Sequence, residues 1–183
     1  MLKDFLIPFM AIGLAELGDK TQLAVICLAS KTKRHFRLLA GVMLAFIIID
    51  GGAIFLGSLI GGLISPDLLR FISGFIFIIF GVLTLLSKKE ESADCELRRP
   101  FMTGFVMILL AEMGDKTQLA SGVFGASYQP IYVFMGVILS LFFLSVAAVI
   151  FGKLLSAKLQ SRTIIRLSGL VFLGVGICFI FGG

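Results

Sequence analysis

One six-residue sequence occurs twice in this chain, each time inside a hydrophobic stretch long enough to cross a lipid bilayer. It reads Glu-Leu-Gly-Asp-Lys-Thr at 16–21 and Glu-Met-Gly-Asp-Lys-Thr at 112–117. A charged side chain at the centre of a membrane helix costs about 2.5 to 3.5 kcal/mol on insertion scales, and such residues normally mark an ion or proton pathway. The repeated charges therefore indicate an ion pathway through a membrane protein.

The composition independently excludes an ordinary soluble domain. Hydrophobic residues make up 58% of the chain, charged residues only 15%, and the mean hydropathy is +1.09. The net charge of +5 does not indicate a nucleic-acid partner, because the basic residues sit in short loops between apolar stretches. Three widely spaced cysteines predict neither a disulfide framework nor a metal site. We therefore expect the lipid bilayer to be the main partner of the chain.

The apolar stretches predict an all-α polytopic membrane protein with six transmembrane helices. They run over 5–28, 38–62, 68–87, 101–124, 131–152 and 163–182. Each is compatible with a helix of roughly 30 Å, the thickness of the hydrocarbon core. The mixed charges of 88–100 predict a solvated connector between the parts 1–87 and 101–183.

These two parts are repeats of one another. Residues 15–24 match residues 111–120 at an offset of 96, with a single difference between Leu17 and Met113. At an offset of 95, further pairs are Gly41 with Gly136, Gly57 with Gly152, and Gly74 with Gly169. Because each repeat holds three spans, an odd number, the second must enter the membrane from the opposite side. The sequence therefore predicts two inverted three-helix repeats, as in many secondary transporters.

The basic residues of the loops predict the orientation of the chain. One side collects Lys31, Lys33, Arg34, Arg37, Lys88, Lys89, Arg98, Arg99, Lys153, Lys158, Arg162 and Arg166. The other side has only Lys3 and Arg70. Since cytoplasmic loops are enriched in Lys and Arg, we expect the connector in the cytoplasm and both termini outside. His35 is expected to be a solvated loop residue.

The repeated acids are predicted to meet at the middle of the membrane. Glu16 and Glu112 each lie 11 residues after the start of their span, which places each roughly 16 Å from its own membrane face. Asp19 and Asp115 follow three residues later and should share a helix face with them. Four carboxylates from opposite directions can then converge.

These side chains have the chemistry of a hard-cation site. Carboxylate oxygens without His or Cys favour calcium, manganese or magnesium over copper or zinc. Gln22 and Gln118 could add amide oxygens at the edge of the same face. Thr21 and Thr117 are predicted to point away and to bond back to helix carbonyls.

The other residues of the repeated sequence leave alternatives open. Lys20 and Lys116 are expected to balance charge or to hold the site in shape. Simple acid–lysine pairs that join helices are the structural alternative, although one such bridge does not require two acids per helix at mirrored depths. Gly18 and Gly114 predict either a break in the helix or close packing of small residues.

Asp50 is the remaining intramembrane acid. Its counterpart at the offset of 95 is Ser145, so its role is asymmetric between the halves. Three interpretations stay open at this point: a proton carrier, an additional cation ligand, or a polar kink formed with Gly51 and Gly52.

The two copies of E-x-G-D-[KR]-[TS] resemble a family of membrane transporters. This family includes the Golgi manganese and calcium transporters of eukaryotes and the manganese exporters of bacteria, within the cation/calcium exchanger group. The resemblance covers the whole chain. It implies two inverted halves that expel Mn²⁺ or Ca²⁺ from the cytosol in exchange for H⁺, with Glu16, Asp19, Glu112 and Asp115 as cation ligands. The absence of a long N-terminal extension and of an extended central loop favours a prokaryotic plasma membrane.

Two other functional classes are weighed against an antiporter. A passive cation channel lined by the same acids would conduct without a proton gradient, and it does not need inverted repeats. An intramembrane metal-dependent enzyme would need a nucleophile or base beside the metal, and none recurs near the acids. We expect no enzymatic activity and no prosthetic group, and a homo-oligomer is compatible with the sequence. Four carboxylates and two protonated lysines leave a charge of −2, which one divalent cation or two protons would neutralise.

Overall fold

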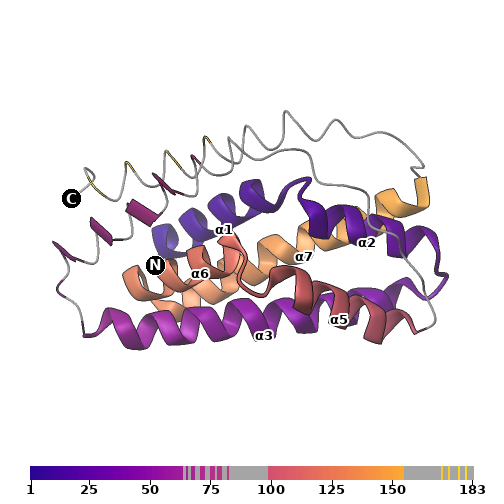
Figure 1. Cartoon of the computed structure of the whole chain (residues 1–183), viewed down its shortest axis with the longest axis horizontal. Helices are drawn as coiled ribbons and strands as arrows, with labels where there is room; N and C mark the ends of the chain where they lie inside the picture. The colour runs from indigo at the N-terminus through magenta and orange to yellow at the C-terminus, as the bar shows by residue number, and fades with distance from the viewer. Residues whose placement is uncertain are drawn as a thin grey trace.

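The described part of the chain, in a computed structural model, contains helices and no strands (Figure 1). The structure describes residues 1–63 and 99–154, together with residues 65, 67, 68, 71, 72, 75, 76, 78, 79, 82, 170, 173, 177 and 180. Its helices are α1 (Leu2–Glu16), α2 (Lys20–Ser30), α3 (His35–Gly61), α5 (Pro100–Glu112), α6 (Lys116–Ser127) and α7 (Pro130–Leu154). Apart from those single residues, the spans expected at 68–87 and 163–182 lie outside the described residues. So does the connector up to residue 98.

Two of the described helices are long and apolar enough to cross a membrane. They are His35–Gly61, with a mean hydropathy of 2.3, and Pro130–Gly152, with 2.7. The spans expected at 5–28 and 101–124 are not continuous helices, and that prediction is wrong. Each is interrupted near its middle, so that α1 continues into α2 and α5 into α6 through a short turn.

The two broken helices run in opposite directions past one another (Figure 1). α1 and α6 lie toward one end of the molecule, and α2 and α5 lie toward the other. The long helix α3 packs along α5 and α6, whereas α7 packs along α1 and α2. Each long helix therefore packs mainly against the broken helix of the other sequence repeat.

Glycines allow these helices to approach closely, at equivalent places in the two repeats. A Cβ added at Gly57 would lie 1.9 Å from the carbonyl oxygen of Gly122, and one at Gly152 would lie 2.6 Å from that of Ile26. The same equivalence relates the approach of Gly41 to Phe101 and of Gly136 to Phe5. Small residues at such crossings are typical of helix packing in membranes. The sequence repeat is thus matched by a repeat of backbone contacts.

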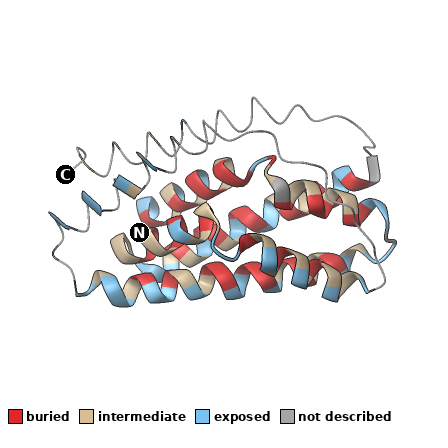
Figure 2. Ribbon diagram, viewed as in Figure 1, coloured by how far each residue is buried: buried red, intermediate tan, exposed pale blue. Residues whose placement is uncertain are grey.

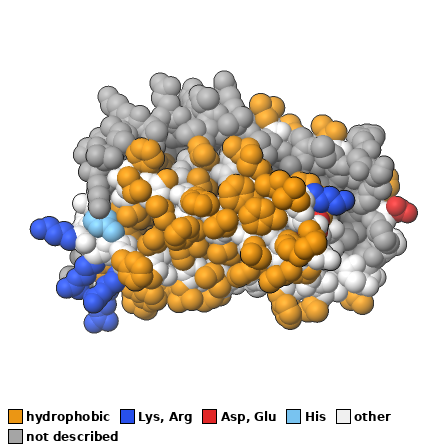
Figure 3. Space-filling model, turned by 180° about the vertical axis from the view of Figure 1, so that it is seen from behind, with side chains coloured by type: hydrophobic (Ala, Val, Ile, Leu, Met, Phe, Trp, Pro, Cys, Tyr) orange, Lys and Arg blue, Asp and Glu red, His pale blue; other side chains and the backbone are white. Residues whose placement is uncertain are grey.

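The outer surface of the helices is apolar. Buried residues line the inner faces of the described helices (Figure 2), while orange hydrophobic side chains cover the surface seen in Figure 3. More than half exposed are Phe55, Leu59, Ile131, Met135 and Phe143. So large an apolar surface is unfavourable in water and indicates contact with lipid.

Basic side chains gather at one end of the molecule. Figure 3 shows Lys and Arg side chains beside the single histidine of the chain, at the end where the α2–α3 loop lies. The exposed basic residues at this end, in the loops and in the first turn of α3, are Lys31, Lys33, Arg34, Arg37 and Arg99. An apolar body with positive charge at one end is the pattern that orients membrane proteins.

Candidate cation site

The first repeated sequence forms a tight turn between α1 and α2. Leu17 has φ −64° and ψ 110°, Gly18 has φ 79°, and the Asp19 N–H donates to the Glu16 carbonyl oxygen at 3.1 Å. These are the features of a type II β-turn, whose third position requires a positive φ. Glycine adopts that conformation without a Cβ penalty, so Gly18 ends the helix.

The second repeated sequence forms the same turn between α5 and α6. Met113 has φ −63° and ψ 112°, Gly114 has φ 82°, and the Asp115 N–H donates to the Glu112 carbonyl oxygen at 3.0 Å. Of the two interpretations of these glycines, the helix break is therefore confirmed in both copies. The argument that Glu and Asp share one face of a continuous helix is wrong, because the turn lies between them.

The threonines bind the glutamates. Thr21 Oγ1 donates to Glu16 Oε2 at 3.0 Å, and Thr117 Oγ1 donates to Glu112 Oε2 at 3.1 Å. The prediction that these hydroxyls bond back to helix carbonyls is therefore wrong. The turn changes the direction of the chain, and this brings the threonine in the first turn of the next helix back to the glutamate.

The glutamines close the turns. The Gly114 N–H donates to Gln118 Oε1 at 2.7 Å, and the Gly18 N–H donates to Gln22 Oε1 in the same way. This bond satisfies an amide that the helix break leaves without its helical partner. A direct role of either glutamine as a cation ligand remains a prediction.

Three carboxylates from the two repeats converge between the breaks. One oxygen each of Glu16, Asp19 and Asp115 lies within 4.8 Å of the others. Glu112 is close enough for its charge to act on Glu16. The glutamates are 3% and 1% exposed, so this concentration of negative charge lies inside the protein.

One lysine joins the two repeats within the cluster. Lys116 Nζ forms an ion pair with Asp19 Oδ2, which links the start of α6 to the turn before α2. This contact agrees with a charge-balancing or shape-holding role. The side chain of Lys20 lies outside the described part of the structure.

The glutamates also carry oxygens that the described residues do not satisfy. Glu16 Oε1 and Glu112 Oε1 are buried and have no hydrogen-bond partner among the described residues. A buried polar oxygen without a partner is costly, and such atoms call for an explanation such as a proton, an ion or a water. The chemistry of these oxygens fits a cation.

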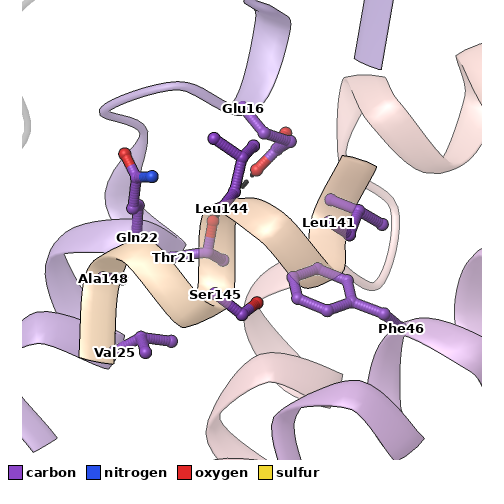
Figure 4. Close-up of a pocket in the computed structure, with 9 residues that line it drawn as sticks. All are labelled: Glu16, Thr21, Gln22, Val25, Phe46, Leu141, Leu144, Ser145 and Ala148. Carbon is purple, nitrogen blue, oxygen red and sulfur yellow. Dashed lines mark hydrogen bonds between the residues drawn. The ribbon is translucent and has the colours of Figure 1, made fainter. Parts of the chain in front are cut away.

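A small cavity adjoins one side of the cluster (Figure 4). It measures about 10 Å³, room for roughly one water molecule. Its polar lining is Glu16, Thr21, Gln22 and Ser145, and its apolar lining comes mainly from α3 and α7. Helix α2, which contributes to the lining, runs from the turn toward the basic end of the molecule (Figure 1).

Asp50 lies on α3, where it binds α6. Its Oδ1 accepts a hydrogen bond from Ser121 Oγ at 2.7 Å, and the two residues are 1% and 0% exposed. The sequence analysis identified Asp50 but missed Ser121. The available signal was the spacing from Thr117, because residues four apart on a helix lie on one face.

The chain is also similar to a family of known proteins. The family profile described as "Divalent cation/proton antiporter GDT1" matches residues 4–92 and 100–183. The chain belongs to the GDT1 family. Members of this family are divalent cation/proton antiporters, and the resemblance seen in the repeated sequence is confirmed.

The relatives match nearly the whole length of this chain. A Vibrio cholerae protein named "Putative manganese exporter" is 31% identical over 170 residues, covering 91% of this chain and 85% of its own. "GDT1-like protein 5" of Arabidopsis thaliana is 28% identical and covers 97% of this chain and 95% of its own. The "Divalent cation/proton antiporter GDT1" of Saccharomyces cerevisiae is 25% identical, covering 98% and 84%. No solved structure matches the chain significantly.

Proposed function

We propose that this GDT1-family protein exports manganese or calcium from the cytosol in exchange for protons, through one site between the two helix breaks. The observation that carries the proposal is the convergence of Glu16, Asp19 and Asp115 from both repeats within 4.8 Å. The name of the Vibrio cholerae relative supports manganese, and that of the yeast relative supports the proton as counter-ion.

The proposed ligands are the four carboxylates of Glu16, Asp19, Glu112 and Asp115. Hard divalent cations prefer six or more oxygen ligands, commonly including water. The free oxygens of the two glutamates and the adjoining cavity support this assignment, because they offer acceptors and room for roughly one water.

Charge balance supports exchange of one divalent cation for two protons. The four acids and two lysines leave a charge of −2 when both lysines are protonated, and the pairing of Lys116 with Asp19 keeps one lysine at the site. Carboxylates crowded in a region of low dielectric compete for protons as well as for metal. Metal and two protons are then alternative occupants that leave the site neutral.

The proposed architecture is that of two inverted three-helix repeats with both termini outside. The opposite directions of the broken helices (Figure 1) and the equivalent glycine contacts support the inversion. The exposed basic residues at one end support a cytoplasmic location for that end. A prokaryotic plasma membrane agrees with the bacterial relative.

Purified protein in proteoliposomes tests this function. With an acidic lumen, external Mn²⁺ or Ca²⁺ should accumulate inside while protons leave, and a proton-conducting ionophore should abolish the accumulation. At fixed pH, a membrane voltage should have little effect. Cation entry that follows voltage and ignores the pH gradient would instead establish the channel.

A further inference from the structure

A row of buried polar side chains leads away from the cation site along α6. Thr117 binds Glu112 at one end of the row, and Ser121 binds Asp50 at the other. All four residues are at most 1% exposed. Each hydroxyl is paired with a carboxylate, which offsets the cost of burying polar groups in a membrane protein, and the two pairs follow one another along α6.

The two hydroxyls of the row lie on one face of α6. Thr117 and Ser121 are four residues apart, which places them about 6 Å apart along the helix axis. This separation is too long for a direct hydrogen bond, so proton passage between the two hydroxyls requires intervening water. The row runs from the break toward the C-terminal end of α6, which is the end opposite the basic loops.

The other repeat lacks this row. The counterparts of Ser121 and Asp50 are Val25 and Ser145. Both line the cavity beside Glu16 instead (Figure 4). The polar row is therefore a feature of one side of the site, and the small cavity lies on the other side.

We propose that Asp50 is a proton relay, which passes protons between the outer side of the membrane and the acid cluster through Ser121 and Thr117. This inference rests on the proposed metal/proton exchange. A proton taken up by the Asp50 carboxylate moves by hydroxyl and water hops to Glu112 as metal leaves, and Asp50 is then ready for the next proton. The metal enters from the cavity side.

The surroundings of Asp50 suit a proton better than a metal ion. The Asp50 carboxylate accepts a hydrogen bond from the Ser121 hydroxyl, whereas a hard cation prefers six or more oxygen ligands. Among the residues that the structure describes, the acids whose charges act on Asp50 are Glu112 on α5 and Asp115 in the turn before α6. Lys116 of α6 is paired with Asp19, and α7 presents Phe134 beside the neighbouring Gly51.

Two substitutions separate a relay from a polar bond that merely joins α3 to α6. Asp50→Asn keeps the size of the side chain and an oxygen that accepts from Ser121, but it cannot carry a proton. Ser121→Ala removes the hydrogen bond and keeps the carboxylate. A structural role predicts the larger defect for Ser121→Ala, and a relay predicts it for Asp50→Asn.

The measurement compares two modes of transport in the same proteoliposomes. Exchange of isotopically labelled Mn²⁺ for unlabelled Mn²⁺ needs no proton movement, whereas uptake driven by an acidic lumen needs it. We expect Asp50→Asn to retain Mn²⁺/Mn²⁺ exchange within about threefold and to lose at least about tenfold in proton-driven uptake. Ser121→Ala should keep more of the proton-driven uptake, and Asp50→Glu should restore it. Ser58→Ala is the matched control, because it removes a hydroxyl of α3 that donates within its own helix, to the Phe55 carbonyl oxygen at 2.7 Å.

Three results would overturn the relay. The first is proton-driven uptake of wild-type size in Asp50→Asn, and the second is an equal loss of both transport modes in that variant. The third is a larger loss of proton-driven uptake in Ser121→Ala than in Asp50→Asn. Failure of the proposed function is distinguishable from all three, because the wild-type protein itself would then exchange Mn²⁺ without responding to pH.

Discussion

At the scale of single residues, the repeated sequence separates into a frame and a charged centre. Glycine allows the β-turn between the two helices. The glutamine side chain accepts a hydrogen bond from the glycine N–H, and the threonine hydroxyl donates one to the glutamate carboxylate. The carboxylates are thereby held from within their own segment. Three of them are brought together, and two buried glutamate oxygens remain for a cation or a proton.

Neutralising one glutamate should stop transport and spare the fold. Glu16→Gln keeps the acceptor oxygen for Thr21 and removes one charge from the cluster. Burying an amide costs less than burying a carboxylate, so thermal stability in detergent should be unchanged or slightly higher. Mn²⁺ uptake should fall by about tenfold or more, because even the loss of a residue that only orients a metal ligand costs about 10- to 100-fold in affinity or activity. Normal uptake by Glu16→Gln would show that the repeated acids are structural.

Removing the charge of Lys116 should make transport sensitive to voltage. Lys116→Gln leaves the proposed site with one additional negative charge, which three protons rather than two would neutralise. Exchange of one Mn²⁺ for three protons then moves one net charge across the membrane in each cycle. Each cycle that moves an uncompensated charge responds to voltage by about 2.3 kcal/mol per 100 mV. Mn²⁺ uptake at equal pH under an imposed potassium diffusion potential measures this effect. Lys116→Arg keeps the charge and should remain insensitive, and an insensitive Lys116→Gln would contradict the charge balance.

At the scale of elements, the helix break determines where the acids stand. A continuous helix would place successive side chains around its circumference. The β-turn instead directs the Glu and Asp side chains toward the equivalent β-turn of the other repeat. The turn depends on a positive φ at Gly18 and Gly114. The backbone conformation of these two residues therefore controls the geometry of the whole site.

Replacing Gly114 with alanine should lower the free energy of unfolding through its effect on the backbone alone. A Cβ at Gly114 meets nothing within 4 Å, so Gly114→Ala adds no clash, only the cost of a left-handed conformation, about 1–2 kcal/mol. Thermal unfolding in detergent should show this loss, together with reduced Mn²⁺ uptake. Gly52→Ala is the matched control, since its Cβ also meets nothing within 4 Å but lies in a helix, where alanine is favoured by about 0.5–1 kcal/mol. Equal stability of both variants would argue against the strained turn.

At the scale of the whole molecule, charge and apolar surface together predict the orientation. Single cysteines in an otherwise cysteine-free chain test it with a membrane-impermeant thiol reagent. Lys33 lies in the exposed loop before α3, and Gln129 lies in the exposed loop before α7. The two test variants are Lys33→Cys and Gln129→Cys. We expect Gln129→Cys to react in intact cells, and Lys33→Cys to react only in inside-out vesicles. The reverse result would invert the proposed topology.

Much of this arrangement was accessible from the sequence. Apolar stretches and the offset of the repeat predicted the helical class and the approximate place of each described helix, and the repeated acids indicated which carboxylates to examine. The turns were one of two interpretations that the sequence left open, because Gly18 and Gly114 fit both a break and close packing. The bonds from Thr21 and Thr117 depend on the turn, so they could not be predicted while that choice was open. Ser121 was missed because a lone serine in an apolar helix shows no periodic pattern.

The exchange of partners between the repeats bears on how such a chain could have arisen. Each long helix covers the broken helix of the other repeat, so one repeat alone leaves the apolar and acidic faces of its own broken helix bare. Two separate copies of a single repeat could cover them only by inserting in opposite directions. A gene that encoded one repeat would therefore have been useful as an antiparallel dimer, and its duplication and fusion would have fixed the two orientations within one chain. Once the repeat was duplicated, the two halves could diverge, as Asp50 and Ser145 have done.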